Sequence, residues 1–208
     1  MPPFQKNGFV VACPATRHGV IIDPGDEVDQ LLQWIAAEQI VVEHILLTHA
    51  HVDHVTGVGI ARAALRVPVW LHRDDAHIYD HALEQARRFG LTLDTPLPPV
   101  DRWYADGDQL TVGTLRIRPL HTPGHCPGGV CLAVTRDGVS DEDLFVGDTL
   151  FAGTVGRTDL PGGDAATLID AIRRVLLSFP DDARVHPGHG PSTTIGHERR
   201  TNPYLQPR

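Results

Sequence analysis

A run of three histidines and one aspartate within six positions, His49-Ala50-His51-Val52-Asp53-His54, constrains the fold of this chain more than any other feature. The residues before it, Glu43–Leu47, are mostly apolar and predict a short buried strand, and Val55–Leu65 predicts a helix. The run therefore lies where a strand ends and a helix begins. In α/β proteins, the carboxyl end of a strand commonly carries functional residues.

Three later loops repeat this arrangement, in which a short apolar strand ends at a loop that contains Gly or Pro and carries a histidine or an aspartate. Glycine permits the backbone angles that such tight loops require. If the strands are neighbours in a sheet, all four loops meet at one sheet edge. The pooled candidates for metal binding are His49, His51, Asp53, His54, His125, Asp148 and His189.

These candidates offer imidazole nitrogens and carboxylate oxygens, without a thiolate. Such donors suit Zn(II), and they also suit Fe or Mn. Seven donors exceed what one tetrahedral ion needs, and they suit two ions about 3.5–4 Å apart that share one carboxylate. Room for a water ligand is typical of catalytic rather than structural sites. The sequence therefore predicts a catalytic centre with two divalent ions, most simply zinc.

The composition argues against several other classes of protein. The 208 residues carry a formal net charge of -8 and contain no Lys/Arg run, which argues against a nucleic-acid partner. No apolar stretch approaches the length of a membrane span, and the N-terminal residues lack a signal-peptide pattern, so we expect a cytoplasmic protein without a membrane partner. The three cysteines form no CxxC motif, which argues against a disulfide framework and a thiolate zinc site.

The order of the predicted elements indicates an α/β fold in one domain, residues 1–208. Apolar runs at Phe9–Cys13 and Gly19–Asp23 predict a hairpin, and Asp26–Gln39 has the spacing of an amphipathic helix. The second half resembles the first in plan, with strands first and a helix last, at Ala165–Ser178. Two such halves predict two mixed sheets packed face to face with helices outside.

Other segments give less regular patterns. One helix is expected over Asp74–Phe89, ended by Gly90, and an irregular glycine-rich stretch is expected over Gly153–Asp164. Arg184–His186 is expected to be the last strand. Two interpretations stay open for three residues near the C-terminus, which either cover the substrate pocket or belong to a solvated tail. These residues are Arg199, Arg200 and Tyr204.

With this ordered set of motifs, the chain resembles the metallo-β-lactamase superfamily of binuclear metallohydrolases. The resemblance covers nearly the whole chain, and the first motif with its three followers is highly specific. It implies an αββα four-layer sandwich and a division of the ligands between two ions. One ion would be held by His49, His51 and His125, the other by Asp53, His54 and His189, with Asp148 bridging them.

Further motifs look like those of the glyoxalase II (hydroxyacylglutathione hydrolase) group, and most like its short, single-domain type. They are Thr122–His125, Gly147–Phe151, Gly156–Asp159 and Thr201–Tyr204. This resemblance implies a thioesterase that cleaves a small-molecule thioester, an S-acylglutathione such as S-lactoylglutathione, by metal-bound hydroxide. Asp53 and Asp148 would orient that hydroxide. The chain stops before the helical domain that supplies glutathione contacts in two-domain members, so the thiol stays open.

Arg157 is a candidate for substrate binding. It lies on the glycine-rich stretch after Asp148, and a planar guanidinium matches the geometry of a substrate carboxylate. An ion pair with Asp159 is an equally open interpretation.

The alternative function is that of a persulfide dioxygenase from the same superfamily, which the chain resembles in its first motif and in Gly156–Asp159. Such an enzyme would use one iron, held by His49, His125 and Asp148 or a similar subset, with O₂ and a glutathione persulfide. A lactonase and a metal-stabilised binding protein without turnover also stay open.

Overall fold

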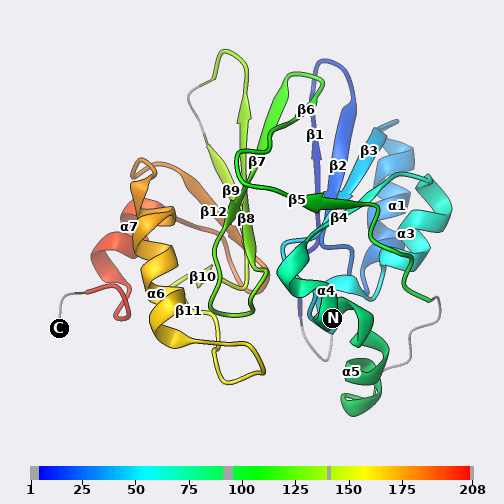
Figure 1. Cartoon of the computed structure of the whole chain (residues 1–208). Coiled ribbons are helices and arrows are strands. Elements are labelled where there is room, and N and C mark those ends of the chain that lie inside the picture. Colours follow the sequence, from blue (N-terminus) through cyan, green and yellow to red (C-terminus); the bar gives the residue numbers. More distant parts are fainter. Residues whose placement is uncertain (1–4, 91–95, 140–141, 207–208) are drawn as a thin grey trace. The chain divides into compact units, whose positions relative to one another are not determined.

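The computed structural model describes residues 5–90, 96–139 and 142–206, which form two compact units. The first unit runs to Tyr104 and includes Thr111–Leu115, and the second comprises Ala105–Leu110 and the chain from Arg116 onward. Each unit contains most of one sheet together with helices (Figure 1). The predicted plan of strands and helices in each half is therefore confirmed, and a single domain over residues 1–208 stays a prediction.

The first sheet has five strands in the order β1-β2-β3-β4-β5. The antiparallel pair β1 and β2 is the predicted hairpin, and β2, β3, β4 and β5 pair in parallel. Because parallel neighbours end at the same edge of a sheet, the residues that follow β2, β3 and β4 lie along one edge. The strand bounds are Phe9–Ala12 (β1), His18–Ile22 (β2), Val41–Leu46 (β3), Val69–His72 (β4) and Arg102–Tyr104 (β5).

Two predicted helices of the first unit are interrupted. The helix predicted from Val55 divides at Gly57, whose N–H donates to the Pro24 carbonyl at 2.8 Å. A Cβ atom on Gly57 would lie 2.6 Å from the same carbonyl oxygen, so this approach requires glycine. The second helix breaks at His81, whose ring nitrogen contacts the His77 carbonyl at 2.8 Å and whose ψ is 9°. The helical segments are α1 (Val28–Ala37), α2 (Val52–Val55), α3 (Val58–Leu65), the 3₁₀ turn η1 (Arg73–Asp75), α4 (Ala76–Asp80) and α5 (Ala82–Arg88).

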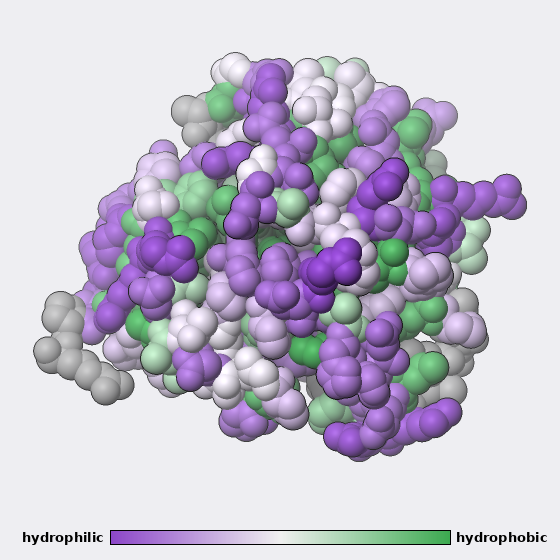
Figure 2. All heavy atoms as spheres, in the orientation of Figure 1, coloured by the Kyte–Doolittle hydropathy of each residue, from purple (hydrophilic) through white to green (hydrophobic). Residues whose placement is uncertain are grey.

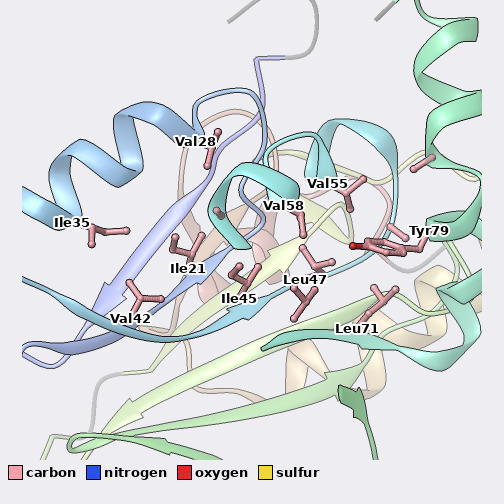
Figure 3. Packing of buried hydrophobic residues seen from close by; sticks show 14 of the residues in the cluster. Ile21, Val28, Ile35, Val42, Ile45, Leu47, Val55, Val58, Leu71 and Tyr79 are labelled. Carbon is pink, nitrogen blue, oxygen red and sulfur yellow. The ribbon is translucent and has the colours of Figure 1, made fainter. Parts of the chain in front are cut away.

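The core of the first unit forms between its strands and helices (Figure 3). Ile21, Ile45 and Leu71 come from three adjacent parallel strands and are fully buried. Burial of one such side chain stabilises the fold by roughly 1.5–3 kcal/mol. From α1, Val28 and Ile35 join the cluster; they are two turns apart and share one face, as the predicted amphipathic spacing requires.

The second sheet has six strands in the order β13-β12-β9-β8-β7-β6. It is mixed, because β12 pairs with β9 in parallel, whereas β8 with β9 and β12 with β13 are antiparallel. The loops that follow β9 and β12 therefore leave the same edge of this sheet. The bounds are Leu110–Val112 (β6), Leu115–His121 (β7), Val130–Arg136 (β8), Asp143–Gly147 (β9), Arg184–Pro187 (β12) and Thr193–Thr194 (β13).

Three expectations for the second unit were wrong. The stretch expected to be irregular contains β11 (Thr154–Val155), which pairs with β10 (Leu150–Phe151). The strand β12 is followed by β13 and by α7 (Ile195–Thr201). The helix predicted over Ala165–Ser178 ends as α6 at Arg174, and a 3₁₀ turn, η2 (Leu176–Ser178), follows it.

Arg199 and Arg200 lie in helix α7 rather than in an irregular tail. Thr194 begins the helix by accepting a hydrogen bond from the His197 N–H at 3.2 Å. The Arg199 guanidinium donates to the Leu177 carbonyl at 2.8 Å, and Arg200 pairs with Asp181 at 3.1 Å. These arginines therefore connect α7 to η2 and to the loop that follows η2.

On the face drawn in Figure 2, hydrophilic side chains are widespread and apolar ones are interspersed among them. Within the described part of the chain, no helix is both long and apolar enough to cross a membrane.

Candidate metal centre

In the first unit, the loop after β3 and the short helix α2 bring the predicted histidines together. His51 has extended backbone angles (φ -64°, ψ 148°) and directly precedes α2, which carries Asp53 and His54. The ring centroids of His49 and His54 are 4.0 Å apart, and those of His49 and His51 are 4.9 Å apart. His49 and His54 are buried, whereas His51 and Asp53 are half-buried. The predicted strand-to-helix junction therefore forms a compact cluster of metal donors.

Asp23, which sequence reasoning did not select, organises this cluster. It directly follows β2, and the residue is only 1% exposed. It accepts hydrogen bonds from the Thr48 N–H at 2.7 Å and the Thr48 hydroxyl at 2.6 Å, and it contacts His54 Nδ1 at 2.9 Å. A carboxylate that accepts from Nδ1 fixes the tautomer and leaves the lone pair on Nε2, as metal ligation requires.

Thr48 extends this support to His49. The Thr48 hydroxyl gives its proton to Asp23, so its oxygen accepts from His49 Nδ1 at 3.1 Å. Ligand atoms of Asp23, His49 and His54 lie within 4.8 Å of one another. We assign Asp23 to positioning rather than to ligation because its two oxygens already accept three hydrogen bonds.

The distance between Asp53 and His54 fits a shared ion. His54 Nε2 lies 3.7 Å from Asp53 Oδ2, which is longer than a hydrogen bond. Two ligand atoms that each lie near 2.1 Å from one tetrahedral ion are about 3.4 Å apart. The pair therefore has nearly the separation of two ligands on one metal.

In the second unit, Asp148 contacts both predicted histidines. Asp148 Oδ2 lies 3.7 Å from His125 Nε2 and 3.5 Å from His189 Nε2. These distances are again close to the separation of about 3.4 Å between ligands on one ion. His125 is buried, and Asp148 and His189 are half-buried. One carboxylate oxygen thus lies between imidazoles from two different loops.

The loop after β11 holds His125 through its backbone. His125 Nδ1 contacts the Arg157 carbonyl at 2.8 Å, so the ring donates there and keeps the lone pair on Nε2. A Cβ atom on Gly156 would overlap the Asp148 carbonyl oxygen, so only glycine allows the loop to come this close. The loop that carries Arg157, the candidate for substrate binding, therefore also supports the proposed metal ligand His125.

The side chain of Arg157 forms an ion pair in this structure. Its Nε and Nη2 donate to the two oxygens of Asp159 at 2.7 and 2.8 Å. This guanidinium lowers the pKa of Asp159 to about 2. Both residues are exposed, so the pair meets water, and a role of Arg157 in substrate binding stays a prediction.

The donors of both units fit divalent ions of the zinc and iron class, because they are imidazole nitrogens and carboxylate oxygens, and Nδ1 contacts leave Nε2 of His49, His54 and His125 available as ligand. The three cysteines, Cys13, Cys126 and Cys131, are all buried.

Comparison with known proteins identifies the family. The profile described as Metallo-beta-lactamase superfamily matches residues 1–189. The protein named Hydroxyacylglutathione hydrolase GloC from Haemophilus influenzae is 40% identical over 205 residues, which cover 97% of this chain and 93% of that protein.

Two solved structures are similar along nearly their full length. The structure of the BLEG-1 B3 metallo-beta-lactamase has a TM-score of 0.88 and 38% identity, covering 100% of this chain and 97% of the other. That of TTHA1623 in a di-iron-bound form has a TM-score of 0.85 and 43% identity, covering 99% and 98%. The predicted metallo-β-lactamase fold is thereby confirmed. The chain belongs to the Metallo-beta-lactamase superfamily and is a metal-dependent hydrolase.

Proposed function

We propose that the chain is a binuclear thioesterase that hydrolyses an S-acylglutathione such as S-lactoylglutathione. The observation that carries this proposal is 40% identity, along 97% of the chain, to a relative named as a hydroxyacylglutathione hydrolase. The proposal includes a small-molecule substrate, a cytoplasmic setting, and no nucleic-acid or membrane partner. The net charge of -8 without a basic run supports the exclusion of nucleic acid.

We further propose that residues 1–208 act as one domain in which the two donor clusters complete one centre. One ion would bind His49, His51 and His125, the other would bind Asp53, His54 and His189, and Asp148 would bridge them. The contacts of Asp148 Oδ2 with two imidazoles support this bridging role. Zinc suits the donors best, and iron or manganese would also fit them.

The bound ions would supply Lewis acidity and lower the pKa of a water toward about 7. The chain's own residues orient the attacking water and hold the ligand histidines in place. Asp53 and Asp148 accept hydrogen bonds from the attacking water and direct it toward the thioester carbonyl. Asp23 and the Arg157 carbonyl keep His54 and His125 in the tautomers that ligation needs.

The leaving group decides between substrate classes. A thiolate departs without a strong acid, because thiols have a pKa near 8.5, whereas the nitrogen of a β-lactam needs a proton. The easier departure of a thiolate supports a thioester substrate.

The substrate class is tested with the protein as purified, after its metal content has been measured. Hydrolysis of S-lactoylglutathione is compared with that of its oxygen ester analogue and of a β-lactam, and oxygen uptake is followed with glutathione persulfide. We expect the thioester to be cleaved fastest, without oxygen uptake. About one iron per chain together with oxygen consumption would instead establish the dioxygenase alternative.

Arg157→Ala tests the proposed contact with a substrate carboxylate. We expect KM to rise by about 3- to 10-fold with kcat nearly unchanged, since an exposed guanidinium contributes binding that is equal in the ground and transition states. Asp159→Asn is the matched control, because it removes the partner and leaves the guanidinium, so KM should stay the same or fall. An unchanged KM in Arg157→Ala would assign Arg157 to its ion pair alone.

A further inference from the structure

A second buried carboxylate holds the loop after β3. Asp75 is the third residue after β4, its side chain is fully buried, and its Oδ2 accepts a hydrogen bond from the Ala50 N–H at 2.9 Å. Ala50 lies between His49 and His51, so this bond fixes the peptide unit that joins two of the proposed metal ligands. Asp75 has no role in the proposed hydrolysis of the thioester.

Asp75 and Asp23 hold this loop from the two neighbouring strands. Strands β2, β3 and β4 are adjacent and parallel, and the two aspartates follow β2 and β4. Asp23 accepts from the Thr48 N–H at 2.7 Å, and Asp75 accepts from the Ala50 N–H at 2.9 Å. Alternate amides of one short loop therefore bind carboxylates that come from different strands.

The negative charges of Asp23 and Asp75 favour the binding of a cation at this loop. Asp23 is 1% exposed and Asp75 is 0% exposed, and a positive charge nearby stabilises a carboxylate that has lost its hydration. A divalent ion is the largest local charge that such a site can hold. The carboxylate should therefore favour the metal-loaded state over the metal-free state.

We propose that Asp75 is a positioning residue of the metal centre. Its oxygen sets the backbone between His49 and His51, and its charge raises the affinity of the ion that these histidines bind. The inference rests on the proposed metal centre and is independent of which substrate the protein hydrolyses.

Asp75→Asn is the informative variant because it keeps the size and one acceptor oxygen and removes the charge. Zn(II) affinity is measured on metal-free protein by competition with a chromophoric chelator, and the melting temperature is measured with and without Zn(II). We expect one Zn(II) site to weaken by at least about 10-fold, as for residues that support metal ligands. Zn(II) should raise the melting temperature of the variant by less than it raises that of the wild type.

Asp80→Asn is the matched control, since Asp80 is an exposed aspartate at the end of α4 in the same unit and belongs to none of the described groups of possible metal ligands, and we expect its Zn(II) affinity to equal that of the wild type. A purely structural role would lower the melting temperature of Asp75→Asn equally with and without Zn(II) and leave its affinities unchanged, which overturns the inference. Wild-type protein that binds no Zn(II) also overturns it. Wild-type protein that binds Zn(II) without cleaving S-lactoylglutathione overturns only the proposed substrate.

Discussion

Replacing Asp148 with alanine is expected to lower kcat/KM for S-lactoylglutathione by about 1,000-fold or more. The proposed bridging carboxylate binds both ions, and a metal ion stabilises the transition state by several kcal/mol, of which about 4 kcal/mol corresponds to a factor of 1,000. In the structure, Asp148 Oδ2 is the atom that lies within 3.7 Å of both His125 Nε2 and His189 Nε2. Its loss should therefore lower metal content as well as turnover.

Metal content and kinetics are measured on the same preparation of Asp148→Ala. Asp159→Ala is a suitable control, because Asp159 is an exposed aspartate of the same unit whose carboxylate pairs with the Arg157 guanidinium. We expect the control to keep its metals and most of its kcat. A variant of Asp148 that retains two ions and more than a tenth of the activity would contradict the bridging assignment.

The second large effect is expected for Asp23→Ala, which should reduce the free energy of unfolding by about 3 kcal/mol or more. The substitution removes the acceptor of three hydrogen bonds, and each buried donor left unsatisfied costs about 1–3 kcal/mol. These donors are the Thr48 N–H, the Thr48 hydroxyl and His54 Nδ1. Because His54 and His49 lose their support, metal affinity should also fall by about 10- to 100-fold.

Urea unfolding of metal-free and metal-loaded protein measures this effect. Asp26→Ala is the control, because Asp26 lies in the same turn and is exposed, and we expect a change within about 0.5 kcal/mol. Asp23→Asn keeps an acceptor oxygen and should recover part of the lost stability. A loss below about 1 kcal/mol in Asp23→Ala would mean that other groups satisfy these donors.

The strand-end pattern of the sequence predicted most of the fold that positions the site. Apolar runs that end at His- or Asp-bearing loops marked β3, β9 and β12, because a buried strand needs apolar residues and a tight loop needs Gly or Pro. The spacing in His49-x-His51-x-Asp53-His54 predicted a donor cluster, because a strand-to-helix turn projects these side chains together. These signals are local and strong.

The residues that support the proposed metal ligands could not be recognised from a sequence pattern. Asp23 begins the segment Asp23-Pro24-Gly25-Asp26, which is typical of a turn. Its carboxylate can support Thr48 and His54 only because β2 pairs with β3, and this pairing is not visible in the sequence. Any residue at position 157 has a carbonyl that can accept from His125, so the sequence cannot mark that contact. Helix α7 has only seven residues, too few for an apolar period to stand out.

The most direct test of a two-metal thioesterase is a titration of metal-free protein with Zn(II), during which S-lactoylglutathione hydrolysis is followed. The proposed ligand set predicts that activity rises until two ions are bound per chain and then stays constant. Full activity at one ion per chain, or no hydrolysis after two ions are bound, would contradict it.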